Sequence, residues 1–159
     1  MSQQNPIRVF VTHNWHDSDD YSRVFEYLES SKNFFYRNTS TPDTPPGATD
    51  SESVRADLRK QIDAAEAVVA LVTLYTDSPD LLVFQMNYAK SKKKPVLLMG
   101  FFGTRQEVPQ LLADRADETG EWNERKMIDA IRFLARGENT ARFDSIDFNP
   151  DDFKDFKLD

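Results

Sequence analysis

The sequence has no cysteine and only two histidines, His13 and His16. The absence of cysteine excludes disulfide bonds, zinc sites built from thiolates and a cysteine nucleophile. A metal site at the two histidines would need carboxylates such as Asp17 or Asp19 as further ligands, and we expect no metal there. Glycine is scarce too, and the five glycines form neither a GxxxxGK[ST] nor a GxGxxG phosphate-binding loop.

Long apolar segments are missing as well. No apolar run approaches the roughly 18 residues that a membrane-spanning helix needs, and residues 1–10 lack the apolar centre of a signal peptide. We therefore expect a cytoplasmic protein without a membrane partner. The formal net charge of -7 argues against general binding to nucleic acid, because the phosphates would be repelled.

Strand-like and helix-like segments alternate along the 159 residues. Short runs of β-branched and apolar residues predict strands, and apolar residues at helical spacing predict helices. The expected strands cover residues 7–12, 32–37, 67–73 and 95–99. The expected helices are one that follows a cap at Ser18 or Asp19, and three over residues 51–65, 79–91 and 121–136. This alternation predicts an α/β domain with a mainly parallel central sheet.

The remaining segments are less regular. Residues 38–50 contain three prolines and a glycine, which predicts a long loop. Residues 101–113 are ambiguous, apart from a helical turn expected at Pro109. Residues 143–159 repeat aromatic and acidic residues, and this tail either docks on the domain or is flexible. We therefore divide the chain into a domain over residues 1–142 and a tail over residues 143–159.

The predicted sheet indicates where a ligand would bind. Ligands of parallel sheets lie beyond the carboxyl ends of the strands. This rule points to the loops after Thr12 and Thr73, and to the start of the helix over residues 79–91. We expect Ser78 to cap that helix, because its hydroxyl can accept a hydrogen bond from a backbone N–H of the first turn. Pro79 suits the first helical position, where the missing donor costs nothing.

One residue of the same helix breaks its apolar pattern. Leu81, Leu82, Tyr88 and Ala89 share a face at helical spacing, and Gln85 lies near the middle of that face. A buried amide without partners costs roughly 1–3 kcal/mol. Two interpretations follow: Gln85 is a core residue whose amide is satisfied by backbone groups, or it projects into a ligand site.

Three segments resemble the TIR-like family, and most closely the bacterial TIR-like proteins of Thoeris anti-phage systems. They are RVFVTHNWHDSDDY (residues 8–21), FFYRNTSTPD (residues 34–43) and DLLVFQMNYAKSKKKPVLLM (residues 80–99). The order and spacing of the three segments carry the resemblance, which runs from Arg8 to Met99.

The resemblance implies a flavodoxin-like three-layer fold and cleavage of the nicotinamide–ribose bond of NAD+, which is a substrate and not a resident cofactor. It implies an NAD+ glycohydrolase or ADP-ribosyl cyclase that makes an ADP-ribose-derived second messenger in prokaryotic anti-phage defence. The messenger would act on a separate effector protein. A phage-derived activator and self-association are further expectations from the same resemblance.

In active members of the family, a glutamate on the third helix binds the ribose and stabilises the cationic sugar. Gln85 occupies that position here. Loss of one unit charge at about 4 Å from a cation removes roughly 4 kcal/mol at an effective dielectric of about 20, or about a thousandfold in rate. Either the amide is a substrate-trapping substitution in an active enzyme, or the chain is a natural binding protein without a catalytic carboxylate.

The resemblance also implies which residues surround the substrate. Gln85 would hold the ribose, Trp15 would stack on a flat ring, and the loop that begins near Tyr36 would cover the site. The implied substrate-binding residues are Thr12, His13, Asn14, Trp15, Asp17, Tyr36, Asn38, Ser40, Ser78 and Leu82.

Two other classes of function stay open. The chain could be a non-catalytic TIR-like interaction module, because Val83 and Met86 are predicted to face away from the apolar side of their helix and could form a contact surface. A nucleoside deoxyribosyltransferase is similar in fold and in N-glycosidic chemistry. That enzyme also needs a glutamate nucleophile, so Gln85 counts against it equally.

Overall fold

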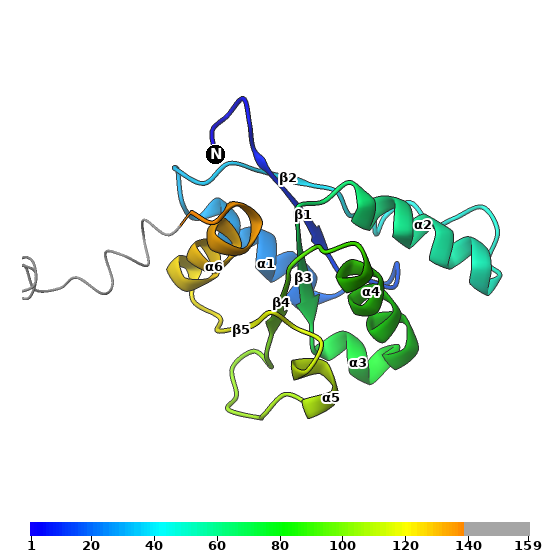
Figure 1. The fold of residues 1–159 in the computed structure, drawn as a ribbon. Coiled ribbons are helices and arrows are strands. Elements are labelled where there is room, and N and C mark those ends of the chain that lie inside the picture. The colour runs from blue at the N-terminus through cyan, green and yellow to red at the C-terminus, as the bar shows by residue number, and fades with distance from the viewer. Residues whose placement is uncertain (139–159) are drawn as a thin grey trace, which may run out of the picture.

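The computed structural model describes residues 1–138 (Figure 1). The predicted domain boundary at residue 142 and the predicted tail over residues 143–159 lie outside the described residues.

A five-stranded sheet forms the centre of the fold. The strands are β1 (Ile7–Val11), β2 (Tyr36–Asn38), β3 (Ala67–Leu71), β4 (Val96–Met99) and β5 (Glu118–Gly120). All pair in parallel, in the order β2-β1-β3-β4-β5. Every residue of β3 and β4 is buried, as expected for central strands covered on both faces.

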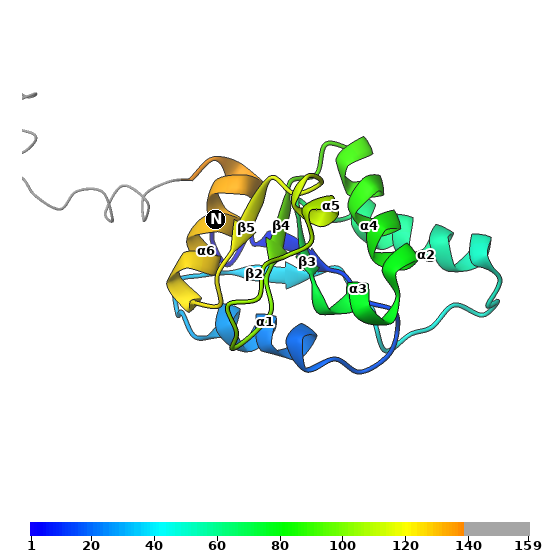
Figure 2. The ribbon, with the colours of Figure 1, turned by 90° about the horizontal axis from the view of Figure 1, so that it is seen from below.

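Helices cover both faces of the sheet (Figures 1 and 2). α1 (Asp19–Glu29) and α6 (Glu124–Arg136) pack on one face, where their apolar residues meet alternate residues of the strands. On the other face lie α2 (Ser51–Asp63), α3 (Thr73–Asp77), α4 (Pro79–Ser91) and α5 (Gln110–Ala113). The predicted flavodoxin-like three-layer α/β fold with a parallel sheet is therefore confirmed.

Most predicted elements are present, with shifted ends. Ser18 caps α1 as expected, because its side chain accepts a hydrogen bond from Tyr21 N–H. β2 begins only at Tyr36, and α6 begins after Asn123, whose side chain accepts from Lys126 N–H. The sequence did not reveal α3 or β5. The predicted strand over residues 67–73 was too long, since Thr73 already belongs to α3.

Two further expectations about α4 were wrong. The Ser78 hydroxyl makes no capping bond, and it accepts a hydrogen bond of 2.9 Å from Asn14 Nδ2 instead. Asn14 thus takes the acceptor that the first turn of α4 would otherwise use. Met86 is completely buried in the core and Val83 is partly buried against it, so this pair does not form an exposed apolar surface.

Polar side chains connect several elements at the amino-terminal ends of the strands, opposite the carboxyl ends at which a ligand is expected. The Arg136 guanidinium pairs with the Glu66 carboxylate at 2.7 and 2.8 Å, and it donates to the carbonyl oxygens of Asn5 and Pro6 just before β1. Glu66 also accepts from Arg8 N–H and Arg8 Nε. The last turn of α6 is thereby tied to the starts of β1 and β3.

Lys94 makes a second polar contact at the amino-terminal ends of the strands. Its ammonium group donates to the carbonyl oxygens of Asp63 and Ala65, at 3.1 and 2.7 Å. These carbonyls belong to the C-terminal end of α2, where backbone acceptors lack helical partners and a cation is favourable. Lys94 therefore caps the C-terminal end of α2.

The Glu66 carboxylate predicts a specific loss of stability in acid. Its bonds to Arg136, together with those to Arg8, lower its pKa from 4.5 to about 2. A depressed pKa contributes stability above the ordinary pKa, and that stability is lost as the pH falls from about 4.5 through about 2. We expect Glu66→Gln to lower the unfolding free energy by roughly 2–3 kcal/mol at pH 7, and this difference to shrink towards pH 2.

Urea unfolding of both proteins across this pH range measures the effect. The matched control is Glu26→Gln, which removes an exposed carboxylate from the middle of α1. A Glu66→Gln difference that does not change between pH 7 and pH 3 would contradict the assignment.

Candidate functional site

A cleft of about 280 Å³ lies beyond the carboxyl ends of β1 and β3. We call it the β1–β3 cleft. In the strand order of this sheet, β1 and β3 are the neighbouring strands at which the chain reverses its direction of progress, and ligands of such sheets bind at this point. The cleft is lined by Thr12, His13, Asn14, His16, Asp17, Ser18, Asp19, Asp20, Leu71, Thr73, Leu74 and Asp77.

Thr12 joins the ends of β1 and β3 at the base of the cleft. Its N–H donates to the Val69 carbonyl at 3.0 Å, and its hydroxyl accepts from Leu71 N–H at 3.1 Å. Thr12 is 1% exposed, so its side chain supports the strands and offers little surface to a ligand.

Gln85 extends this support to His13. Its Oε1 accepts from His13 N–H at 3.1 Å, and its Nε2 donates to the carbonyl oxygens of His13 and Leu81, both at 3.0 Å. Gln85 is 0% exposed. Its amide is therefore fully used by backbone groups, which is the first of the two interpretations from helix geometry.

This bonding pattern requires an amide. A carboxylate could accept from His13 N–H, but its second oxygen would face the carbonyl oxygens of His13 and Leu81 without a proton to share. A glutamate at position 85 would therefore be protonated or would turn away from its present place. The arrangement of Gln85 suits glutamine, not an ionised glutamate.

The imidazole of His13 forms a second buried link. Its Nδ1 accepts from Trp15 N–H at 3.3 Å, so Nε2 carries the proton and donates to Gln61 Oε1 at 2.8 Å. Gln61 Oε1 also accepts from Thr41 N–H, at 3.0 Å, in the loop after β2. Burial lowers the pKa of His13, although its bond to Gln61 and the charges of nearby aspartates oppose this shift.

The open side of the cleft carries negative charge. Within residues 1–138, the carboxylates of Asp17, Asp19 and Asp77 have no hydrogen bond or ion pair. The fourth carboxylate, that of Asp20, is buried, pairs with Arg23 and accepts from the Thr73 hydroxyl at 3.0 Å. Free carboxylates favour a ligand that is cationic or rich in hydroxyl groups.

The structure brings together part of the predicted site. Thr12, His13, Asn14 and Asp17 line the cleft, whereas Gln85 and Leu82 lie buried behind it. Ser78 lies outside the lining but contacts it through Asn14.

Trp15 packs beside the cleft instead of lining it. Its ring meets the His13 ring edge-on, with 4.8 Å between ring centroids. Its backbone is in the left-handed region, with φ of 64°, and its buried indole Nε1 has no hydrogen-bond partner among the described residues. The predicted stacking of Trp15 on a ligand stays a prediction.

Tyr36, Asn38 and Ser40 lie beyond the cleft as well. The Tyr36 hydroxyl donates to Glu29, while the Ser40 and Asn38 side chains bond the hydroxyl of Tyr21 at 2.7 and 3.0 Å. These contacts fasten the start of the loop after β2 to α1.

Sequence reasoning missed several lining residues. Thr73, Leu74 and Asp77 come from α3, which was not predicted. Asp19 was considered only as a helix cap or a metal ligand, and Asp20 was given no role. The rule that ligands bind after the parallel strands did point to the segment after β3, so that rule could have identified Thr73 and Asp77.

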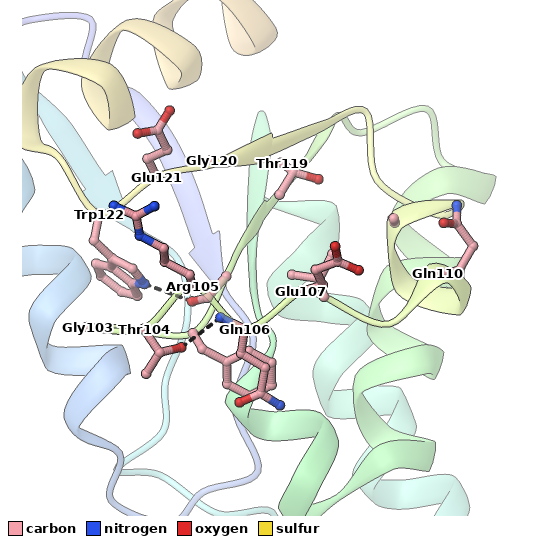
Figure 3. Close-up of a pocket in the computed structure, with 14 residues that line it drawn as sticks. Gly103, Thr104, Arg105, Gln106, Glu107, Gln110, Thr119, Gly120, Glu121 and Trp122 are labelled. Carbon is pink, nitrogen blue, oxygen red and sulfur yellow. Dashed lines mark hydrogen bonds between the residues drawn. The ribbon is translucent and has the colours of Figure 1, made fainter.

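A second, larger cavity of about 830 Å³ lies beyond the ends of β4 and β5 (Figure 3). We call it the β4–β5 cavity. The loop over residues 100–109 forms one side of it and residues 119–122 form the other. Trp122 Nε1 donates to the Gly100 carbonyl at 2.8 Å and so joins the two sides.

Within residues 1–138, no three side chains of the metal-binding types are grouped so that they could hold an ion. In the same part of the chain, no helix combines the length and the apolar character needed to cross a membrane.

Comparisons with known proteins identify the fold and nothing finer. No described protein family and no curated protein matches the sequence. A crystal structure of a conserved protein from Enterococcus faecalis V583 is similar, with a TM-score of 0.56 and 10% sequence identity. The similarity covers 80% of this chain and 98% of that one. It supports the three-layer α/β fold.

The bonding of Gln85 predicts a pH-dependent cost for Gln85→Glu. At pH 8 we expect a loss of roughly 2–4 kcal/mol in unfolding free energy, because a buried carboxylate would face two carbonyl oxygens. Such a carboxyl has a raised pKa in the folded state, so the loss should lessen as the pH falls and the group is protonated. Urea unfolding at pH 8 and pH 5 measures this, with the exposed Gln106→Glu as control. Equal stability of the two variants at pH 8 would refute it.

The environment of His13 predicts a neutral ring in the folded protein. Because burial lowers its pKa below the ordinary 6.5, the unfolded chain takes up a proton that the folded chain does not, and stability falls as the pH drops below about 6.5. We expect NMR of the imidazole nitrogens to show the Nε2–H tautomer at pH 8 and a titration midpoint below 6.5. A His16→Gln variant leaves His13 as the single histidine and makes the assignment direct. A midpoint at or above 6.5, or the Nδ1–H tautomer, would contradict it.

Proposed function

We propose that this chain is a cytoplasmic TIR-like domain that binds the nicotinamide riboside end of NAD+ in the β1–β3 cleft and does not cleave it. The observation that carries the proposal is the Gln85 amide, which stands where the resemblance expects a glutamate and which donates to two buried carbonyl oxygens. A residue bound in this way supports the cleft but supplies no charge to a cationic sugar.

The lining of the cleft suits this ligand. The nicotinamide ring of NAD+ is cationic, and the ribose has two hydroxyl groups. Asp17, Asp19 and Asp77 provide unpaired carboxylates that attract a cation and accept hydrogen bonds from hydroxyls. Neutral Asn14 lines the same cleft, with its amide already fixed by Ser78.

The bonding of Gln85 favours a natural binding protein over a substrate-trapping variant of an active enzyme. In a trap, restoring glutamate restores activity, because the amide differs from the catalytic group only in charge. Here a glutamate would lose the bonds to the carbonyls of His13 and Leu81. The active NAD+ nucleosidase or cyclase is therefore the second candidate, and the test below separates the two.

The resemblance supports a role in prokaryotic anti-phage defence. A chain that binds NAD+ without cleaving it makes no nucleotide messenger, so signalling to an effector would depend on the bound state or on another catalytic subunit. Activation by a phage component and self-association remain proposals from the same resemblance.

The proposal is tested with the unaltered protein, Gln85→Glu and Asp77→Asn. Calorimetry should show NAD+ binding to the unaltered protein, at least about tenfold weaker in Asp77→Asn, because a charge-assisted contact to the cationic end is lost. A nicotinamide-release assay should show no turnover by the unaltered protein or by Gln85→Glu.

Circular dichroism confirms that each variant is folded. NAD+ cleavage that appears in folded Gln85→Glu would establish the enzyme interpretation. An unaltered protein that does not bind NAD+, but forms concentration-dependent oligomers, would favour the interaction module.

A further inference from the structure

Both cavities lie beyond the carboxyl ends of the strands, and their sizes differ. The β1–β3 cleft measures about 280 Å³ and the β4–β5 cavity about 830 Å³. Pockets for small molecules usually span about 300–1,000 Å³, so the cleft suits a fragment of nucleoside size and not a whole dinucleotide. The proposed function leaves the larger cavity without a role.

One row of contacting side chains runs from the lining of the cleft to the lining of the β4–β5 cavity. Asp20 lines the cleft and pairs with Arg23. The Arg23 guanidinium carbon lies 3.6 Å from the centre of the Phe102 ring, and Phe102 meets Trp122 edge-on with 5.6 Å between centroids. Trp122 lines the β4–β5 cavity. Phe102 is 42% exposed, so the top of this row is open and a ligand could cross it.

The two linings differ in their cationic groups. The cleft is lined by four aspartates and by no lysine or arginine, whereas the β4–β5 cavity has an arginine beside its two glutamates, Glu107 and Glu121. The β4–β5 cavity has Arg105, which makes no hydrogen bond, ion pair or ring contact with the described residues. Figure 3 shows its side chain rising from the loop over residues 100–109 on the side of Trp122 and Glu121. Glu121 itself pairs with Lys126 at 3.3 Å.

The backbone of the same loop offers further donors. The N–H groups of Gly103, Thr104 and Arg105 make no hydrogen bond with the described residues, and Gly103 adopts a φ of 75° that a side chain would strain. Unpaired backbone N–H groups beside a guanidinium are a typical arrangement for binding phosphate oxygens. Glu107 and Gln110, which also line the cavity, can accept hydrogen bonds from ribose hydroxyls or an adenine amino group.

We propose that the β4–β5 cavity binds the AMP half of a dinucleotide, with Arg105 as the residue that contacts its phosphate. This inference rests on the proposed function for the other half, the nicotinamide riboside, in the β1–β3 cleft. The dinucleotide crosses the contact between Arg23 and Phe102, and its anionic part lies away from the carboxylates of the cleft.

The experiment is calorimetry with NAD+, nicotinamide mononucleotide and AMP as separate ligands. The unaltered protein should bind NAD+ about tenfold or more tightly than the mononucleotide, because only NAD+ reaches the second cavity. Arg105→Ala should weaken NAD+ and AMP binding about tenfold and leave mononucleotide binding unchanged. Arg37→Ala is the matched control. Arg37 is an exposed arginine on β2, the edge strand on the side of the sheet away from β4 and β5, and it too has no partner among residues 1–138.

The outcomes separate this inference from the proposed function. AMP binding that depends on Arg105 supports the cavity site, even where the mononucleotide does not bind and the cleft proposal fails. Mononucleotide binding without AMP binding, or equal affinities for NAD+ and the mononucleotide, overturns the cavity site and leaves the cleft proposal intact. An Arg105→Ala protein that behaves like Arg37→Ala also overturns it.

Discussion

The hydrogen bonds between Gln85 and the backbone of His13 hold the candidate site together. The β1 strand ends at Val11, and His13 lies beyond the last ladder bonds, yet its N–H and carbonyl are buried. Buried backbone groups need partners. α4 supplies them from one side chain, which accepts from the N–H and donates to the carbonyl. This need explains a polar residue on an otherwise apolar helical face.

Several other elements meet at the same place. The His13 ring is joined through Gln61 to the loop after β2, and Asn14 is joined to Ser78 at the start of α4. The buried wall of the cleft is therefore fixed by interlocking hydrogen bonds, while the free carboxylates lie on its exposed side. A site with a fixed wall and unpaired charges loses little freedom when it binds a ligand.

The sequence allowed the fold class, the order of the main elements and the position of the cleft to be predicted. It could not show α3, because Thr73 follows the apolar run of β3 directly and no side chain caps the helix. It could not show β5 either, because that strand has three residues, Glu118–Gly120, and is defined only by its pairing with β4.

Contacts between distant residues were beyond sequence reasoning too. The bond of Asn14 to Ser78 and the contact of Arg23 with Phe102 arise only when separate elements are packed together. Helix geometry alone allowed a Gln85 satisfied by backbone groups, which is what the structure has. The resemblance instead assigns a catalytic position, and that assignment is a matter for experiment.

The two ends of the strands differ in how firmly side chains hold them, and this difference bears on the evolution of the protein. Arg136, Glu66 and Lys94 make hydrogen bonds at the amino-terminal ends of the strands, where a substitution would lower stability. At the carboxyl ends, the loop over residues 100–109 and the exposed aspartates make few hydrogen bonds to the rest of the domain. Mutations there can accumulate without unfolding the domain, so the residues of the candidate site can change while the scaffold is kept.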